Sequence, residues 1–96
     1  MKKIEIIIDK AFLNKILPKF DEAGIGGYSV IEVLRGKGDA NDETVSSGAI
    51  FASKSVYILS IAEENSIEPF KRAVLPFISD AGGVFIVSTP DFIALH

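Results

Sequence analysis

Residues 24–38 read GIGGYSVIEVLRGKG, and the rest of the chain is arranged around this stretch. Glycines at both of its ends permit positive φ and let other groups approach the backbone closely. Between them, residues 28–34 alternate and are rich in β-branched side chains, which is typical of a strand. The stretch therefore predicts a turn, a strand and a flexible exit into polar residues 39–55. A segment of that length is either a functional loop or an idle one, and composition leaves both open.

Upstream of this stretch, the sequence predicts one strand and one helix. Residues 3–8 alternate, so that Ile4, Ile6 and Ile8 share a face. Asp9 is expected to cap a helix over residues 10–23, because its carboxylate can accept the free N–H groups of the first turn. Apolar side chains recur there at helical spacing, from Phe12 to Phe20. Pro18 predicts a kink or a second short helical segment, and Gly24 predicts the end of the helix.

Downstream, the sequence predicts a strand, a helix and a last strand. Residues 56–62 and 84–88 are rich in Val, Ile and aromatic side chains. Asn65 or Ser66 is expected to cap a helix that runs to about Ile78, with Pro69 in its first turn. The turn at residues 80–83, DAGG, then breaks the helix.

The predicted order is β-α-β-β-α-β in a single domain over residues 1–96. Two strand–helix–strand halves with this spacing predict an α+β, ferredoxin-like split βαβ sheet with both helices on one face. The other face would then carry uncovered apolar side chains, which is unusual in a monomer. These side chains are Ile7, Ile31, Val33, Tyr57, Leu59, Ile61 and those of the fourth strand. Ser29 lies on the same face. We therefore expect this face to pack against copies of itself in a cyclic oligomer.

Composition excludes several classes of function. The net charge of −3 and the absence of a long basic run disfavour nucleic acid as a partner. There is no cysteine, which excludes disulfides, thiolate catalysis and Cys-based zinc sites. The apolar run at residues 4–8 is too short and too broken for a signal peptide or a membrane span. We therefore expect a cytoplasmic protein without direct membrane insertion.

The sequence offers little catalytic chemistry. The one histidine is His96, and a nucleophile–base pair is not evident from it. Asp39, Asp42 and Glu43 lack the spacing of a calcium loop and are interpreted as solvated charges. We therefore expect neither an enzyme nor a metal site.

Two glycine turns remain as candidate binding sites. One is Gly36-Lys37-Gly38, preceded by Arg35, and the other is Ala81-Gly82-Gly83. Backbone N–H groups in such turns can form an anion-binding concavity, and Arg35 or Lys37 can add a charge-assisted bond to phosphate. Neither turn is a Walker loop.

Placed on this element order, the motifs resemble those of a PII-like signalling protein. Residues 1–8, MKKIEIII, resemble the first residues of PII proteins. Residues 23–33, AGIGGYSVIEV, resemble the PII pattern Gly-x-x-Gly, a hydrophobic residue and then Thr-Val-x-Glu-Val. Gly36-Lys37-Gly38 then stands at the base of the T-loop, about residues 37–55. Residues 77–87, FISDAGGVFIV, resemble the B-loop, about residues 79–84, and the last strand. The pattern is closer to the SbtB-type and carboxysome-associated branch than to nitrogen PII.

The resemblance implies a homotrimer that binds an adenine nucleotide, AMP, ADP, ATP or cyclic AMP, in clefts between subunits. Bicarbonate or another small anion is a further expected ligand of these clefts. Ile7 and Ser29 would lie by the adenine, and Arg35 with Gly36-Lys37-Gly38 would line the cleft at the loop base. Ala81, Gly82 and Gly83 would face the phosphates from the neighbouring subunit. The T-loop would then report the ligand state to a partner protein. The expected partner is a membrane transport protein for bicarbonate or another anion.

Departures from the family pattern keep alternatives open. The acidic residues Asp39, Asp42 and Glu43 stand where SbtB-type chains have arginines, and Val84 replaces a basic B-loop residue. These changes predict nucleotide binding that is weakened, shifted toward AMP or ADP, or lost. The first alternative is therefore a PII-like module that binds its partner without nucleotide. The second is a CutA-type metal-responsive trimer, which shares the fold.

Overall fold

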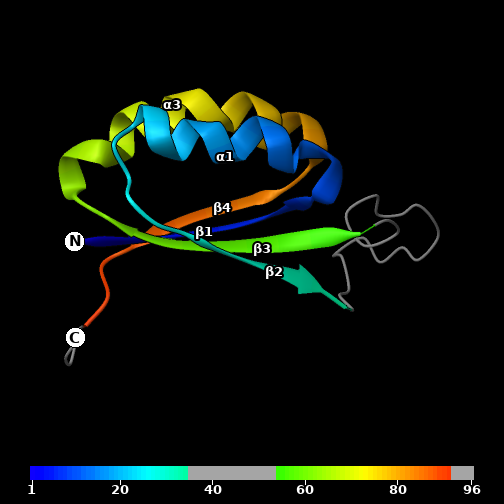
Figure 1. Ribbon diagram of the computed structural model, residues 1–96, viewed down its shortest axis with the longest axis horizontal. Coiled ribbons are helices and arrows are strands. Elements are labelled where there is room, and N and C mark those ends of the chain that lie inside the picture. Colours follow the sequence, from blue (N-terminus) through cyan, green and yellow to red (C-terminus); the bar gives the residue numbers. More distant parts are fainter. Residues whose placement is uncertain (35–53, 92–96) are drawn as a thin grey trace.

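The computed structural model describes residues 1–34 and 54–91. In this part of the chain a four-stranded sheet is covered by two α-helices, with a short 3₁₀ helix before the first of them (Figure 1). The elements are β1 (Lys2–Asp9), η1 (Lys10–Phe12), α1 (Leu13–Glu22), β2 (Ser29–Val33), β3 (Ser55–Ala62), α3 (Glu64–Ala81) and β4 (Val84–Ser88). The predicted β-α-β-β-α-β order is confirmed.

The sheet has the strand order β2-β3-β1-β4, and every neighbouring pair is antiparallel. β3 therefore lies between β1 and β2, and β1 lies between β3 and β4, which is the split βαβ arrangement. Both α-helices lie on the same side of the sheet (Figure 1). The ferredoxin-like α+β prediction is therefore correct.

The core lies between the helices and one face of the sheet. Ile4, Ile6 and Ile8 are fully buried there, because alternate residues of β1 point to the same side. The Phe20 ring of α1 packs against the Phe70 ring of α3, with 4.4 Å between ring centroids. Burial of these large apolar side chains is the main source of the fold's stability.

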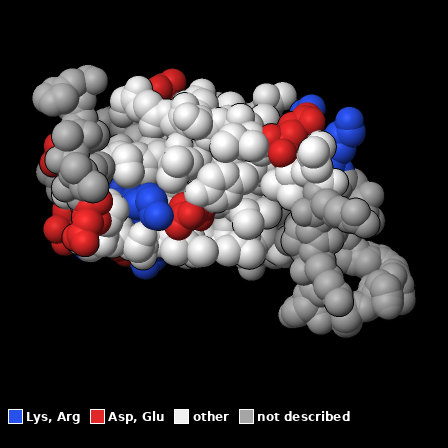
Figure 2. All heavy atoms as spheres, turned by 90° about the horizontal axis from the view of Figure 1, so that it is seen from below, with Lys and Arg blue, Asp and Glu red and all other residues white. Residues whose placement is uncertain are grey.

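The opposite face of the sheet, here called the open face, has no covering layer among residues 1–34 and 54–91. In each strand, the residues that alternate with the core positions lie on this face. They are Lys3, Glu5, Ile7, Asp9, Ser29, Ile31, Val33, Ser55, Tyr57, Leu59, Ile61, Val84, Ile86 and Ser88. Ile31 is 53% exposed and Ile86 is 45% exposed, although both are large apolar residues. The view onto this face is dominated by uncharged atoms (Figure 2). The predicted bare apolar face is therefore present in the protomer.

Several element boundaries differ from the predictions. The segment predicted as one helix from residue 10 starts instead as η1, with the Asp9 carboxylate accepting a 2.8 Å hydrogen bond from the Ala11 N–H. α3 begins at Glu64, and its N-cap is Glu63 without a side-chain hydrogen bond, so the prediction of an Asn65 or Ser66 cap is wrong. α3 also continues past Ile78 to Ala81. The predicted break at residues 80–83 is therefore confined to Gly82 and Gly83.

Three prolines lie inside the helices of the described chain. Pro18 is within α1, and Pro69 and Pro76 are within α3. The sequence predicts Pro69 in the first turn of its helix, but the earlier start at Glu64 places it in the second. Each proline lacks an N–H, so the carbonyl four residues before it loses its helical partner. No helix of the described residues is long and apolar enough to cross a membrane.

Candidate functional site

Ile7 and the Gly82–Gly83 turn lie together at one end of the sheet. Ile7 is paired with Val84, the residue that follows the turn. A Cβ added to Gly83 would lie 2.6 Å from the Ile7 carbonyl oxygen, a distance that real Cβ atoms do not reach. Glycine at position 83 is therefore required so that the end of α3 can approach the backbone of β1.

The N–H groups of this turn are already used within the protomer. Gly82 has φ +71 and ends α3 in the left-handed conformation. Its N–H donates to the Ser79 carbonyl at 3.3 Å, and the Gly83 N–H donates to the Ile78 carbonyl at 2.9 Å. In this conformation the two groups cap the helix, and the helix end that they cap is the negative end of its dipole. The turn permits close approach of a ligand, but it does not present these two donors to an anion.

Ala81 and Ser29 lie differently from the glycine turn. Ala81 is the last helical residue of α3 and is not part of a loop. Ser29 is exposed at the start of β2, on the same open face as Ile7 but with β3 between the two strands. Ser29 is paired with Leu59, whereas Ile7 is paired with Tyr57. A single protomer therefore brings Ile7 to the glycine turn but keeps Ser29 apart from both.

The other predicted residues of the cleft lie outside the described residues. They are Arg35, Gly36, Lys37 and Gly38, together with most of the predicted T-loop and the acidic residues Asp39, Asp42 and Glu43. His96 also lies outside them. β2 ends at Val33, and the described chain resumes at Lys54. The described residues on either side of the predicted loop therefore lie at the end of the sheet where Ile7 and Gly83 meet.

An ion pair connects Glu32, near the end of β2, to Lys10 at the start of η1. The Lys10 ammonium donates a 2.7 Å hydrogen bond to the Glu32 carboxylate of β2, and the Lys10 N–H donates to the Lys54 carbonyl at 2.9 Å. The hydrogen bond from Lys10, its charge and the charge of Lys54 lower the pKa of Glu32. Both cations therefore lie close to a carboxylate of the same chain. Sequence reasoning missed this pair, because it depends on the register of β2 against β3.

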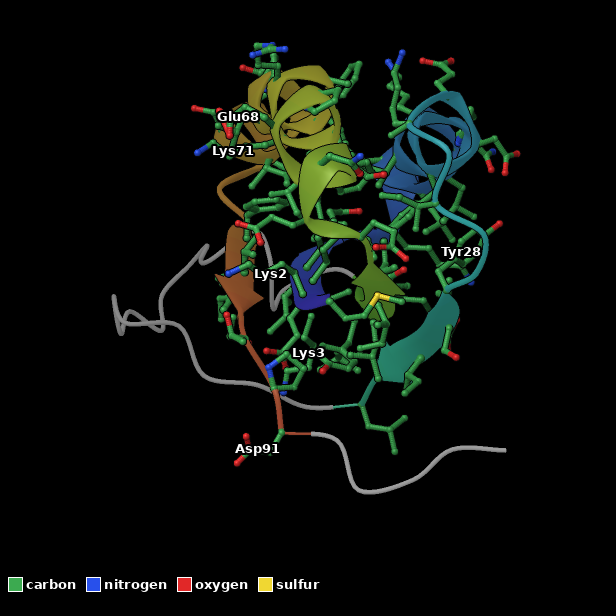
Figure 3. All side chains as sticks on the ribbon, turned by 90° about the vertical axis from the view of Figure 1, so that its left-hand side faces the viewer. Lys2, Lys3, Tyr28, Glu68, Lys71 and Asp91 are labelled. Carbon is green, nitrogen blue, oxygen red and sulfur yellow. The ribbon has the colours of Figure 1, made fainter. Side chains whose placement is uncertain are left out.

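A second polar group stands in the middle of the open face. The Tyr57 hydroxyl donates a 2.6 Å hydrogen bond to the Glu5 carboxylate, and the Lys3 ammonium lies 3.8 Å from the other oxygen of that carboxylate. The hydrogen bond to Glu5, together with burial and the negative charge of Glu5, raises the pKa of Tyr57. The end-on view shows Lys3 on the side of the sheet away from the helices (Figure 3). The sequence carried a signal for this group, namely opposite charges at alternate positions of one strand.

A family model for the nitrogen regulatory protein P-II matches residues 1–96, which is the whole chain. The chain belongs to the P-II family. The predicted resemblance to PII-like signalling proteins is therefore confirmed.

Solved structures of P-II-like proteins share this fold. CPII from Thiomonas intermedia K12, a nitrogen regulatory PII-like protein, was solved bound to ADP, AMP and bicarbonate. It is 27% identical, with a TM-score of 0.71, over 96% of this chain and 94% of that one. A CPII structure bound to ADP, AMP and acetate is also 27% identical, with a TM-score of 0.71, over 91% of this chain and 82% of that one. A PII-like protein from Thermus thermophilus, at 14% identity and TM-score 0.67, covers 91% of this chain and 83% of its own and shows the fold alone. No curated protein matches the chain in sequence.

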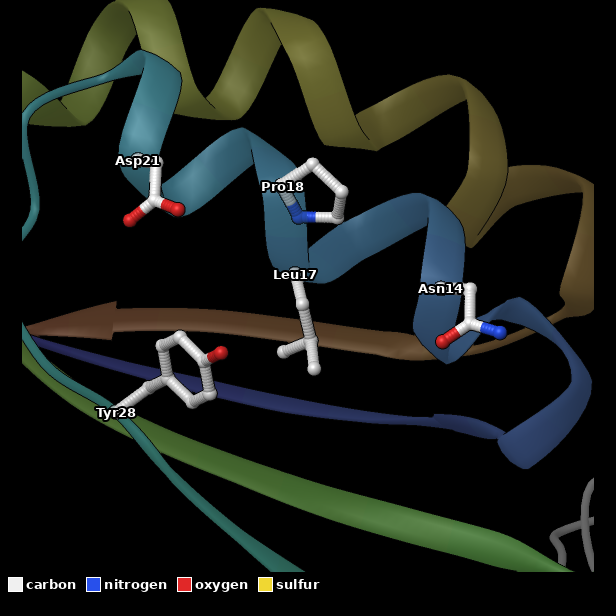
Figure 4. A pocket seen from close by; sticks show the side chains of 5 residues that line it. All are labelled: Asn14, Leu17, Pro18, Asp21 and Tyr28. Carbon is white, nitrogen blue, oxygen red and sulfur yellow. The ribbon is translucent and has the colours of Figure 1, made fainter.

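This P-II chain also has an open hollow that sequence reasoning missed. It is lined by Asn14, Leu17, Pro18, Asp21 and Tyr28, between α1 and the start of β2 (Figure 4). It lies on the helix side of the sheet, so it is separate from the Ile7–Gly83 end. The described residues also contain no group of three His, Cys, Asp or Glu side chains arranged to hold a metal ion.

Proposed function

We propose that this chain is a PII-like regulator that assembles as a homotrimer and binds an adenine nucleotide in the clefts between subunits. Its T-loop, about residues 37–55, would report the nucleotide state to a transport protein for bicarbonate or another small anion. The observation that carries the proposal is the juxtaposition of Ile7 and Gly83 at the sheet end where β2 ends and β3 begins, on either side of the predicted T-loop. CPII, at 27% identity, binds ADP, AMP and bicarbonate, which supports ligands of this class.

The geometry of the protomer favours one assignment of the cleft residues to the two subunits that form each cleft. Ile7, Ala81, Gly82 and Gly83 lie together in one protomer, so a cleft that uses them takes them from one subunit. Ser29 lies on the far strand, so the neighbouring subunit would supply it. This assignment revises the expectation that Ile7 and the glycine turn come from different subunits. Arg35, Gly36, Lys37 and Gly38 would complete the cleft beside the first group.

Electrostatics near the cleft favour a ligand with few phosphates. Lys10 and Lys54, two described cations at this end of the sheet, both lie close to Glu32, and the Gly82 and Gly83 N–H groups cap α3. Val84 supplies no charge where a basic residue was expected. We therefore expect AMP or ADP to bind more tightly than ATP, because each added phosphate needs further positive charge.

Calorimetric titration with AMP, ADP, ATP and cyclic AMP tests the proposal, with and without bicarbonate. We expect saturable heat with AMP or ADP. Ser29→Ala should weaken the binding by roughly 2- to 10-fold, the value of one lost hydrogen bond. Ser66→Ala, which removes the same hydroxyl from α3, is the matched control and should bind as the wild type does. Absence of heat with all four nucleotides would reject the nucleotide role.

A nucleotide-independent binding module is the second candidate. It is favoured by the capping use of the Gly82 and Gly83 N–H groups. Affinity capture from a membrane fraction, with and without ADP, separates the two candidates. A partner whose capture responds to ADP supports the sensor, and a partner captured equally in both conditions supports the module. The CutA-type metal-responsive alternative finds no ligand cluster among the described residues.

A further inference from the structure

The Glu5–Tyr57 pair occupies the centre of the face that we propose to be buried between copies. Glu5 lies on β1 and Tyr57 on β3, and their 2.6 Å hydrogen bond runs diagonally between the two strands, because Glu5 is paired with Leu59 and Tyr57 with Ile7. Long side chains at such diagonal positions are within reach of each other. The pair is therefore positioned by the register of the two central strands.

Apart from Lys3, the side chains around the pair on the open face are apolar. Its paired neighbours on the open face are Leu59, Ile7, Ile31 and Ile86. The Glu5 side chain keeps 24% of its surface exposed in the protomer, so solvent still reaches the carboxylate. A layer of a second copy over these residues would remove that solvent.

We infer that the Tyr57 hydroxyl allows the Glu5 carboxylate to be buried in ionised form when copies cover the open face, and that the pair thereby controls the strength of assembly. This inference rests on the proposed assembly through that face. Burying a charge is costly unless donors replace the lost water, and leaving it short of one donor costs the desolvation of that group. On the described open face, Tyr57 donates a hydrogen bond to Glu5, and Lys3 adds a positive charge 3.8 Å away.

The charged and titratable groups of the open face limit the alternatives. On β1 they are Lys3, Glu5 and Asp9, and on the described part of β3 the one such group is Tyr57. Asp9 lies at the end of β1, where it is paired with Ser55, and its carboxylate accepts a hydrogen bond from the Ala11 N–H. The described residues of β2 and β4 place only Ser29, Ile31, Val33, Val84, Ile86 and Ser88 on this face, and none of these titrates. A covering copy that uses the same face brings the same four groups. Without Tyr57, Lys3 is the group on the described open face that remains close to the Glu5 carboxylate, and protonation of Glu5 removes the charge that must be buried.

The test compares the dissociation constant of the assembly for wild type and Tyr57→Phe between pH 5 and pH 8, by sedimentation equilibrium. At pH 8, Tyr57→Phe should raise the dissociation constant by about 10- to 100-fold for each subunit in the assembly, the value of one lost hydrogen bond to a charged group. The variant should regain affinity as the pH falls, since a protonated Glu5 carries no charge to bury. Glu5→Gln combined with Tyr57→Phe should remove this pH dependence.

Tyr28→Phe is the matched control, because it removes the hydroxyl of the other tyrosine, which lies on the helix side of the sheet. It should assemble as the wild type does at every pH. A wild type that assembles together with a Tyr57→Phe variant of equal affinity would overturn this inference and leave the proposed function standing. A wild type that stays monomeric would overturn both. Circular dichroism of each variant establishes that it is folded.

Discussion

At the scale of single residues, Gly83 joins the end of α3 to the backbone of β1. A Cβ at this position would be 2.6 Å from the Ile7 carbonyl oxygen, and that atom belongs to the central strand of the sheet. We expect Gly83→Ala to lower the free energy of unfolding by about 1–3 kcal/mol, since the overpacking must be relieved by a backbone shift. Urea unfolding at fixed protein concentration measures the change.

Gly26→Ala is the control for that substitution. A Cβ at Gly26 meets no atom within 4 Å, and its φ is not positive. Its effect on the free energy of unfolding should be small or slightly stabilising. Equal stability of the Gly83→Ala and Gly26→Ala variants would contradict the close approach of α3 to β1.

The Lys10–Glu32 pair makes a second prediction at this scale, on the pH dependence of stability. Its partner lowers the pKa of Glu32 below the unfolded value of about 4.3. Ionised Glu32 therefore stabilises the fold above that pH, and the contribution is lost as the pH falls through the lower pKa of the folded state. The stability difference between wild type and Glu32→Gln should be small at pH 7 and should shrink toward pH 3 in urea unfolding.

Lys10→Met provides the reference for this pair. In that background, Glu32→Gln should have little further effect on stability at pH 7, because the partner of the carboxylate is already absent. A stability difference between wild type and Glu32→Gln that stays constant from pH 7 to pH 3 would argue against the pair.

At the scale of elements, α3 is a helix that tolerates two prolines. Pro76 is exposed and lies inside the helix, where its missing N–H leaves the Arg72 carbonyl without a helical partner. Pro76→Ala should therefore raise the free energy of unfolding by about 1–3 kcal/mol, reduced somewhat by the greater freedom of the unfolded chain. Thermal unfolding followed at 222 nm tests this, and a lower midpoint for the variant would show that the proline is needed for packing.

The helices and strands differ in how well the sequence patterns predict them. The strands were predicted within about two residues, because alternation of Ile4, Ile6 and Ile8 with polar neighbours is a local property. The start of α3 at Glu64 was missed, since Asn65 and Ser66 have better capping side chains but lie inside the helix. Contacts that depend on register were beyond reach, such as Gly83 against Ile7 and Tyr57 against Glu5. The motif resemblance predicted Ile7 and Gly83 as site residues, and the fold shows that one protomer brings these two residues together.

At the scale of the whole molecule, the open face stands out, because the described residues of one protomer leave its large apolar side chains exposed. Ile86 is 45% exposed on β4 and contributes to no buried cluster of the described protomer. Ile86→Lys should therefore leave the protomer folded while preventing assembly, because a lysine would have to be buried between copies. Light scattering should report single chains for this variant, and circular dichroism should match the wild type.

Leu75→Lys is the matched control for Ile86→Lys. Leu75 is 39% exposed, and it lies on α3, on the opposite side of the sheet. It should assemble as the wild type does. Assembly of Ile86→Lys with wild-type affinity would place the interface elsewhere on the molecule.

The most direct test of the account is the molar mass of the wild-type chain in solution, measured by sedimentation equilibrium over a wide range of concentration. Burial of the open face between three copies predicts a mass three times that of one chain, stable on dilution into the low micromolar range. A mass of one chain at every concentration would contradict the account, since neither the covered face nor the clefts between subunits would then exist.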